Sequence, residues 1–355
     1  MPPDAGAVRI ARPTVHLDGR ESPSLTTGLI ALRIEESVSG ISACELAVGN
    51  WGPDGGGPGF LHFDRRDVEF GKGLAISIRD TLLFSGRISG LEGQFPEGSP
   101  PQLVLLAEDR LQALRMTRRT RTFTDSTDEA VIRRIASDHG LTADVRLQGP
   151  THKVLAQLNQ SDLAFVQDRC RALDAEAWVE DRTIKVRTHA DRTGAELELG
   201  YGHELREFTV TADLADQATE VKVGGWDVAA KGAIEEKAGS DAVEGELAGG
   251  DAAATILSRA FSARTETVVH TAPVTGEEAR ARAAAIYRRR ARTFVRGRGL
   301  TDTDARLRVG RRVKLRGLGP LFDGGYHVTE TRHVFDPMLG MRTEFAVERP
   351  GLGRP

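Results

Sequence analysis

The sequence has few of the residues that cross-link a fold, stack on ligands or anchor a protein in a membrane. Cysteine occurs only at Cys44 and Cys170, without metal or redox spacing, so a reduced chain is expected, although a disulfide between them stays open. No run approaches the roughly 18 apolar residues of a membrane helix. The N-terminus MPPDAGAVRIARP contains no apolar core of signal-peptide length. We therefore expect synthesis in the cytoplasm without a signal peptide, and no membrane partner.

An excess of charge of either sign is also missing. The chain carries 48 lysines and arginines against 51 aspartates and glutamates, a formal net charge of −3. This balance gives no overall attraction toward nucleic acid, so none is expected as a partner. The 355 residues exceed what one hydrophobic core usually serves, which predicts two or three domains. Many of the 39 glycines lie between short alternating segments, as turns in β-rich proteins do.

Residues for catalysis or metal binding gather in no recognisable motif. The histidines lack zinc-ligand spacing with a third ligand nearby, and neither HExxH nor GxSxG occurs. His327 and His333 lie six positions apart in an expected strand, which favours a shared face toward solvent or a partner. The adjacent carboxylates Glu35–Glu36 and Glu235–Glu236 point apart, although a long-range carboxylate pair stays open. We therefore expect a protein that is not an enzyme, with no catalytic, cofactor-binding or metal residues and no cofactor.

Arginines form two clusters: Arg115, Arg118, Arg119 and Arg121, and Arg288–Arg290 with Arg292. Phosphate-binding surfaces are built in this way. However, acidic residues lie among them, no ladder of aromatic residues accompanies them, and a helix C-terminus favours arginine on its own. A solvated face or a salt-bridged subunit contact is therefore the favoured interpretation.

The first 115 or so residues have the period-two alternation of β-strands. Three segments alternate most clearly: Ile30–Ile34, Cys44–Val48 and Leu74–Ile78. With Leu82–Ile88 and Leu103–Ala107 they give roughly six strands, which suits a small barrel or sandwich. The glycine-rich stretch 50–59 lacks the Lys-Ser/Thr and helix of a phosphate-binding loop, so it is interpreted as a long flexible connection.

Helical spacing begins near residue 120. The capping-box pattern Ser126–Glu129 predicts a helix capped by Ser126 and ended by Gly140. Its buried face is expected to carry Val131, Ile132 and Ile135. A second helix is expected from Ser161, followed by a hairpin around residues 180–182. These elements predict a compact α/β unit over residues 117–190.

The C-terminal part returns to strands, expected at Phe208–Val210, Val221–Trp226, Leu307–Gly310, Val313–Leu315, Tyr326–Val328 and Thr343–Val347. Glu277–Arg292 should be a helix, acidic at its start and basic at its end. Its narrow apolar stripe is mostly alanine, too weak for a membrane-surface helix. Residues 230–265 are poor in large apolar groups, which predicts a surface excursion of low stability.

Five segments match, in chain order, the motifs of one known family. Phe84–Leu91 is similar to its F-S-G-x-V strand, and Ala107–Leu114 to the D-x-x-x-x-L element that follows. Val131–Leu141 is similar to its I-x-x-I-A-x-x-x-G-L helix, and Gln160–Val166 to its S-D-x-x-F helix. Leu307–Gly319 is similar to the closing strands, G-x-x-V-x-L-x-G-x-G. Together they resemble the phage late control protein D family, the hubs of contractile tails, which are related to the N-terminal part of VgrG spike proteins.

The resemblance implies a mainly β fold with an α+β insert, in which two tail-tube-like β-barrel domains flank a small α/β domain. The expected domains are the first barrel (1–116), the α/β insert (117–195) and the second barrel (196–355), which has an extended insertion around 230–300. The implied function is a structural baseplate hub of a contractile injection system or phage tail. Such a hub is a homotrimer that adapts the trimeric spike to the hexameric inner tube.

The implied partners are further copies of the chain, the spike protein, the inner tube protein and other baseplate components, all within a phage-tail-like particle. VgrG-type chains continue into an OB-fold and a β-helical spike, whereas this sequence stops just past the hub, so a separate spike protein is expected.

Two other functions stay open. One is a tail-associated peptidoglycan hydrolase, although no additional domain is seen. The other is a stand-alone surface- or carbohydrate-binding β-protein that stacks sugars on Trp51, Trp178 and Trp226, although an aromatic content of 5% disfavours it.

Overall fold

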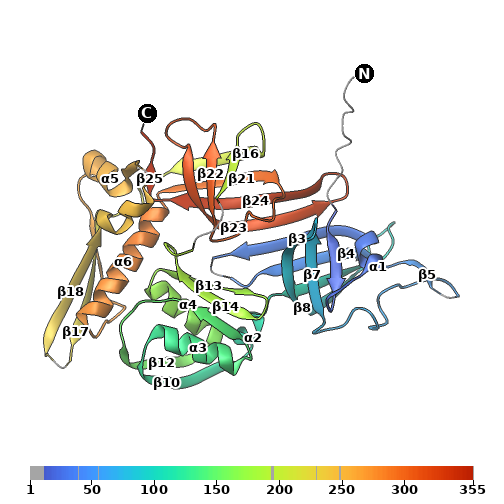
Figure 1. Cartoon of the computed structure of the whole chain (residues 1–355), viewed down its shortest axis with the longest axis horizontal. Coiled ribbons are helices and arrows are strands. Elements are labelled where there is room, and N and C mark those ends of the chain that lie inside the picture. Colours follow the sequence, from blue (N-terminus) through green and yellow to red (C-terminus); the bar gives the residue numbers. More distant parts are fainter. Residues whose placement is uncertain are drawn as a thin grey trace. The chain divides into compact units, whose positions relative to one another are not determined.

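The computed structural model describes residues 12–38, 40–54, 56–192, 196–228, 230–247 and 249–354 (Figure 1). The fold is mainly β with an inserted α/β part, as the sequence predicts. The chain divides into two compact units. Unit 1 comprises residues up to 110 with 300–305 and 331–344, and unit 2 comprises 111–299, 306–330 and 345–355. The three domain ranges expected from the sequence stay a prediction, and the expected lack of a signal peptide concerns residues 1–11, which lie outside the described residues.

Unit 1 is built on one sheet with the strand order β2-β1-β7-β8-β9-β4-β3-β23. Its strands are β1 (Thr14–Leu17), β2 (Arg20–Glu21), β3 (Leu29–Ser37), β4 (Ala43–Gly49), β7 (Gly73–Ile78), β8 (Thr81–Gln94), β9 (Gln102–Glu108) and parts of β21 (Val295–Asp302), β23 (Gly324–Asp336) and β24 (Gly340–Arg349). A short helix, α1 (Pro23–Thr27), joins β2 to β3. The glycine-rich stretch predicted as a flexible connection instead contains a small hairpin of β5 (Gly52–Asp54) and β6 (Gly57–Gly59).

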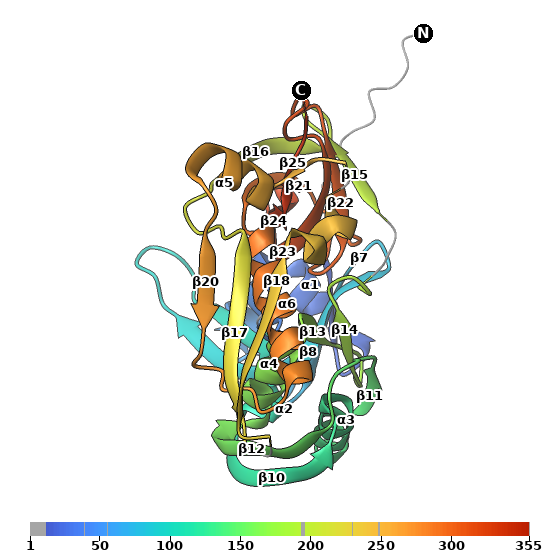
Figure 2. The ribbon, with the colours of Figure 1, turned by 90° about the vertical axis from the view of Figure 1, so that its left-hand side faces the viewer.

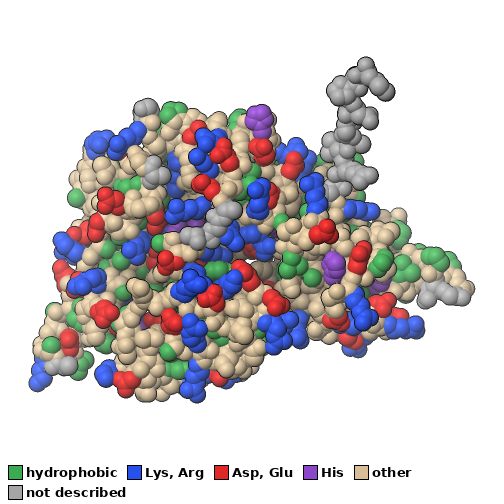
Figure 3. All heavy atoms as spheres, in the orientation of Figure 1, with side chains coloured by type: hydrophobic (Ala, Val, Ile, Leu, Met, Phe, Trp, Pro, Cys, Tyr) green, Lys and Arg blue, Asp and Glu red, His purple; other side chains and the backbone are tan. Residues whose placement is uncertain are grey.

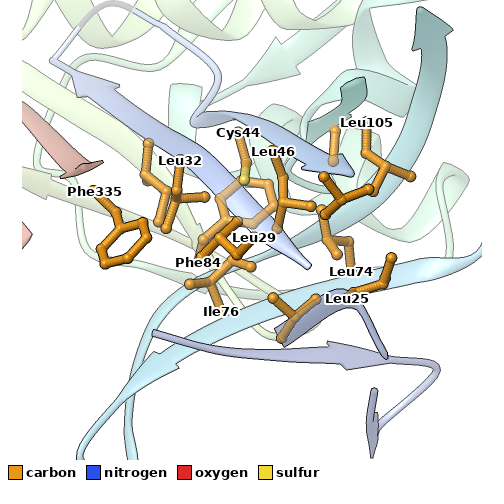
Figure 4. Packing of buried hydrophobic residues seen from close by; sticks show 14 of the residues in the cluster. Leu25, Leu29, Leu32, Cys44, Leu46, Leu74, Ile76, Phe84, Leu105 and Phe335 are labelled. Carbon is orange, nitrogen blue, oxygen red and sulfur yellow. The ribbon is translucent and has the colours of Figure 1, made fainter. Parts of the chain in front are cut away.

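The predicted alternation places the core of unit 1 correctly, apart from one position. Cys44, Leu46, Leu74 and Ile76 are buried together with other apolar residues of the sheet (Figure 4). In β3, however, Leu29 is buried instead of the expected Ile30. The register of β3 against β4 shifts between Leu29 and Ala31, and such a bulge moves the side chains before it to the opposite face.

The α/β part of unit 2 combines two small sheets with helices. β10 (Arg118–Ser126) pairs with β12 (His152–Ser161), and β14 (Thr183–Thr188) lies between β11 (Thr142–Val145) and β13 (Ala175–Glu180). The helices are α2 (Gln112–Arg115), α3 (Asp128–Asp138) and α4 (Asp162–Ala172). Helix α3 contacts β10 and β11, and α4 contacts β12 and β13. The mixture of helices and strands predicted over residues 117–190 is therefore present, whereas a separate compact unit over this range stays a prediction.

The predicted N-cap of α3 was wrong by one residue. The Thr127 hydroxyl, and not that of Ser126, accepts a hydrogen bond from the Ala130 amide at 3.2 Å. Ser126 still belongs to β10, where it pairs with His152, so its backbone is committed to the sheet. Gly140 follows the helix with a φ of 65°, a left-handed conformation that ends helices readily, as predicted.

A third sheet of unit 2 supports the longest helix. β17 (Glu220–Asp227) lies between β18 (Gly232–Gly239) and β20 (Thr265–Val268), and α6 (Gly276–Arg292) packs against β17 and β18 (Figure 2). This confirms the helix predicted over Glu277–Arg292. Its buried stripe includes Ala279, Ala283 and Tyr287. Within the described part of the chain, none of the helices combines the length and hydropathy that a membrane span requires.

The predicted surface excursion over residues 230–265 needs correction. Besides β18 it contains the 3₁₀ helix η1 (Ser240–Glu246), β19 (Asp251–Ala252) and α5 (Ala253–Phe261). Val243 and Leu257 are fully buried, and Val243 belongs to the same core cluster as Ala279 of α6. The small side chains of α6 let these segments approach closely, so few large apolar residues suffice to form a core.

β23 also takes part in the strand order β16-β21-β24-β23-β22-β15, so these strands belong to the same 13-stranded sheet. The further strands are β15 (Leu197–Gly200), β16 (Leu205–Ala212) and β22 (Arg312–Arg316), and β25 (Gly351–Leu352) pairs with β19. The strand predicted over Leu307–Gly310 was wrong. Gly310 has a φ of 77°, which interrupts the extended path in a turn before β22.

Candidate functional site

The two histidines that the sequence singles out and both cysteines are buried. His327 and His333 are both buried, which corrects the expected solvent- or partner-facing role. Cys44 and Cys170 are free and buried, and burial raises the pKa of both thiols, that of Cys170 to about 12. Among the described residues, no three side chains of histidine, cysteine, aspartate or glutamate are arranged to hold a metal ion.

Among the described residues of unit 2, Asp162 organises a first buried charge network. Its carboxylate, at the first position of α4, pairs with Arg121 at 2.8 Å and His139 at 2.8 Å, and accepts a hydrogen bond from Gln157 at 2.9 Å. Burial alone would raise the pKa of Asp162, but these partners, with Arg119, hold it below its usual range. The Ser-Asp pair of the S-D-x-x-F motif thus has a structural role, in which Ser161 caps the helix and Asp162 gathers cations.

Asp128 organises the second network at the start of α3. It forms a two-point ion pair with Arg169 and accepts a hydrogen bond from His152 at 3.1 Å. Burial opposes the ionised form, but His152 and Arg169 hold the pKa of Asp128 below its usual range. A carboxylate–histidine pair also occurs in hydrolases, but it activates a nucleophile at a cleft. Here all three side chains are buried, which favours a structural role.

The third network surrounds Arg292 at the end of α6. Its guanidinium binds Asp174 at 2.6 and 2.7 Å and Glu246 at 2.7 Å through two further bonds. Burial would lower the pKa of Arg292, but the two carboxylates raise it, so the arginine stays charged. The network thereby ties α6 to η1 and to the turn after α4.

Next to this network, Glu176 pairs with Arg192 and with His327 at 3.2 Å. The rings of His327 and His189 lie 3.7 Å apart between centroids. Burial, with His327 and Arg292 nearby, lowers the pKa of His189 strongly, so this ring is neutral. The neutral imidazole and the internally paired charges form a packed polar core.

The arginine clusters are largely used within the chain. Arg119 and Arg121 bind Asp162, Arg290 binds Glu266, and Arg292 belongs to the third network. The sequence favoured a solvated face or a salt-bridged subunit contact, whereas these ion pairs lie within one chain, and a subunit contact stays a prediction.

The surface of unit 1 carries a cluster of exposed aromatic side chains, here called the aromatic patch: Trp51, Phe60, Phe63 and Phe95. Their rings lie 5.0–6.3 Å apart between centroids, and each side chain is 37–66% exposed. In Figure 3 hydrophobic side chains reach the surface at the right-hand end of the view, over the hairpin of β5 and β6. Contiguous exposed aromatic surface is typical of an interaction site.

The loop beneath the aromatic patch is held in place. Asn50 is fully buried, and its side-chain oxygen accepts a hydrogen bond from the His62 amide at 2.7 Å. The backbone N–H of Asn50 donates a hydrogen bond to the Pro101 carbonyl oxygen at 2.9 Å. A Cβ added at Gly93 would lie 3.2 Å from the rings of Phe63 and Phe95. Because glycine has no side chain, the two rings can pack closely against β8 at this position. The patch is therefore preorganised.

A second uncharged surface lies on unit 2 and is here called the outer β10–β12 face. In the register of the two strands, Thr122 pairs with Ala156 and Thr124 with Val154, and all four side chains are exposed. Thr120 and Leu158 extend the same rows, and Leu158 is 65% exposed. The opposite side of this sheet is buried and contains the stacked rings of Phe123 and Phe165. The face is a flat array of threonine and aliphatic side chains.

One of the three tryptophans proposed to stack on sugars has its ring occupied. The Trp178 ring is covered by the Arg192 guanidinium, 4.1 Å from its centroid. This arrangement disfavours the carbohydrate-binding alternative.

Sequence reasoning missed the aromatic patch. No role was predicted for Phe60–Phe63, which directly follow the glycine-rich stretch 50–59. The available signal was local enrichment, because Trp51, Phe60 and Phe63 fall within 13 residues of a chain that is 5% aromatic.

Comparisons with known proteins give a family match and, separately, a likeness in fold. The model of the Alg8 N-terminal domain family matches residues 9–336. No curated protein matches the chain in sequence. Among solved structures, the chain is similar to the 43 kDa tail protein of prophage MuSo2 from Shewanella oneidensis, with a TM-score of 0.71 and 12% identity over 96% of this chain and 98% of that one.

Two further structures extend the likeness. The tail protein from Neisseria meningitidis MC58 gives a TM-score of 0.69 with 13% identity, covering 96% of this chain and 97% of that one. The third structure is an Escherichia coli component of the type VI secretion system, described as structurally similar to the T4 bacteriophage tail proteins gp27 and gp5. It gives a TM-score of 0.58 with 13% identity, covering 96% of this chain and 79% of that one. At these identities the likeness establishes the fold, which is that of phage-tail and type VI secretion proteins.

Proposed function

The chain belongs to the family of the Alg8 N-terminal domain. From its fold, which it shares with phage-tail and type VI secretion proteins, we propose that it is a structural baseplate hub of a contractile injection system or phage tail. In this proposal it forms a homotrimer that adapts a trimeric spike to a hexameric inner tube. Its partners are the spike protein, the inner tube protein and other baseplate components. We also propose that the chain is related to the phage late control protein D family, whose motifs its sequence resembles.

One observation carries the proposal: the likeness to tail proteins extends over nearly the whole of both chains. A shared domain alone would leave room for a different function in the remainder. Here 96% of this chain aligns with 98% of the Shewanella oneidensis tail protein, so little of either chain is left for another activity.

We further propose that the protein acts without catalysis and without a cofactor. The titratable clusters support this, because their charges are paired with one another inside unit 2 and both cysteines are buried. The exposed apolar surfaces also suit a protein that works through contacts with other chains.

The trimer is tested by multi-angle light scattering on the purified full chain. The expected mass is that of three copies of the 38.4 kDa chain. Co-sedimentation with the spike and inner tube proteins encoded in the same gene cluster should then recover a complex with each. A stable monomer with affinity for neither protein would contradict the proposal.

The absence of catalysis has its own test. A zymogram on peptidoglycan is expected to show no clearing by the purified chain. Clearing at its position in the gel would support the alternative, a tail-associated peptidoglycan hydrolase.

A further inference from the structure

We propose that the aromatic patch of unit 1 binds the outer β10–β12 face of a second copy of the chain, in a head-to-tail contact. This inference rests on the trimer proposed above and names the two surfaces that would form it. A head-to-tail contact uses two different surfaces of one chain, and repeating it around a three-fold axis closes a ring.

The two surfaces are complementary in chemistry. The aromatic patch presents ring faces and edges, which pack well on branched aliphatic and threonine side chains. The outer β10–β12 face presents such side chains in register, with Val154 beside Thr124 and Ala156 beside Thr122. None of its six side chains is charged, so ring contact there would leave no buried unpaired charge.

The charges around the two surfaces have opposite signs. The segments 64–72 and 92–97, which flank the rings of the aromatic patch, contain five acidic residues against three basic ones. At the ends of the outer β10–β12 face lie the exposed Arg118 and the ion pair of Lys153 with Asp125, and no other acidic residue belongs to the two strands. Charges of opposite sign near the two surfaces favour this pairing, and charges of the same sign disfavour contact between two copies of one surface.

The size of the aromatic patch also suits a subunit contact. Four aromatic side chains that are roughly half exposed present on the order of 400 Å² of apolar surface. That is about half of the roughly 800 Å² per partner in a specific interface. The charged rims provide the polar surround that such interfaces have.

The rings are also held in place before binding. Asn50 fixes the loop that carries Phe60 and Phe63, and Gly93 admits the rings of Phe63 and Phe95 against β8. Little ordering is therefore needed when the partner binds, which lowers the free-energy cost of association.

The test uses one charged substitution in each surface. Phe95→Asp and Leu158→Asp are each expected to lose the trimer, with at least a tenfold weaker association by light scattering. Because the two surfaces differ, an equal mixture of the variants retains one intact pairing, between the aromatic patch of the Leu158→Asp chain and the face of the Phe95→Asp chain. The mixture is therefore expected to form complexes of two copies.

Matched controls place the same substitution at exposed apolar residues elsewhere. Met338→Asp in unit 1 and Val228→Asp in unit 2 are expected to remain trimeric. Thermal unfolding of all four variants shows whether each is folded.

Cross-linking gives a readout that does not depend on destabilising the contact. Cys44 and Cys170 are buried, so cysteines introduced at the surface are the reactive ones. The double variant Phe95→Cys/Leu158→Cys should form oligomers that resist SDS under oxidation, and each single variant should not.

Three outcomes would overturn the inference. If the chain is trimeric and Phe95→Asp remains trimeric, the aromatic patch serves another partner, such as the inner tube protein, and the proposed function survives. If Phe95→Asp dissociates but Leu158→Asp remains trimeric, the patch binds a different surface of the second copy. If the unmodified chain is monomeric, the contact and the trimer fail together.

Discussion

Arg292 is the residue on which the third buried charge network of unit 2 depends. It faces two carboxylates, Asp174 and Glu246, and is 3% exposed. A buried arginine in this position offers limited net stability over an apolar residue of similar size, because burying the charges costs free energy. Its loss, however, leaves two carboxylates buried without a cation.

We predict that Arg292→Met lowers the free energy of unfolding by about 3–5 kcal/mol, the usual cost of breaking a buried ion pair. The measurement is urea unfolding at pH 7. Arg290→Met is the matched control, because Arg290 lies on the same helix and pairs with Glu266 at the surface. The control should change stability by less than about 1 kcal/mol. Equal effects of the two substitutions would contradict the structural role assigned to Arg292.

Glu348 supplies a pH-dependent contribution to stability. Burial raises its pKa to about 7, and the nearby carboxylates of Glu176, Glu246 and Asp174 add to this, whereas Arg292 opposes it. Because the pKa in the folded chain lies above the ordinary value of 4.5, the folded chain holds a proton that the unfolded chain releases. The resulting stabilisation is complete below about pH 4.5 and is lost as the pH rises through about 7.

We therefore predict that Glu348→Gln stabilises the chain at pH 8.5, by about 1–3 kcal/mol, and has a smaller effect at pH 5. Urea unfolding at the two pH values measures the difference. Glu330→Gln, on an exposed side chain of β23, should show no such pH dependence. A stabilisation that is the same at both pH values would show that Glu348 is not protonated in the folded chain.

At the scale of single elements, local pattern predicts most of the strands and helices. The alternation of Cys44, Leu46 and Val48 places β4 correctly, and the helical spacing around α3 and α6 predicts both helices. Errors occur where one residue decides the geometry. The bulge in β3 depends on pairing with β4, and the turn at Gly310 depends on a single positive φ.

The buried networks could not be predicted from sequence, because their members are distant along the chain. Arg292 and Asp174 are separated by 118 residues, and His327 and Glu176 by 151. Each of these residues looks like an ordinary surface residue in its own segment. Only the packing of α6 and β23 in unit 2 brings them together.

The N-cap of α3 gives a test at this scale. We predict that Thr127→Ala lowers the free energy of unfolding by about 1 kcal/mol, because the Ala130 amide loses its acceptor. Ser126→Ala, one position earlier, should cost less, because the Ser126 hydroxyl donates to the Thr124 carbonyl at the end of a strand and caps no helix amide. Thermal unfolding of both variants measures the difference, and the reverse order would restore Ser126 as the cap.

At the scale of the whole molecule, the charged side chains of the networks are paired in the interior, whereas the surfaces offered to other chains are uncharged. The polar groups that look chemically capable, in the networks of Asp162, Asp128 and Arg292, are paired with one another inside unit 2. The aromatic patch and the outer β10–β12 face, by contrast, are apolar or uncharged and exposed. A protein of this kind is suited to function through its surfaces in an assembly.

The central claim is that the chain is the hub between spike and tube. Electron cryo-microscopy of the tail particle that contains this protein tests it most directly. We predict three copies of the fold in one ring, between the trimeric spike and the first ring of the inner tube. Particles with a complete spike–tube junction from which the fold is absent, or in which it lies elsewhere in the particle, would contradict the account.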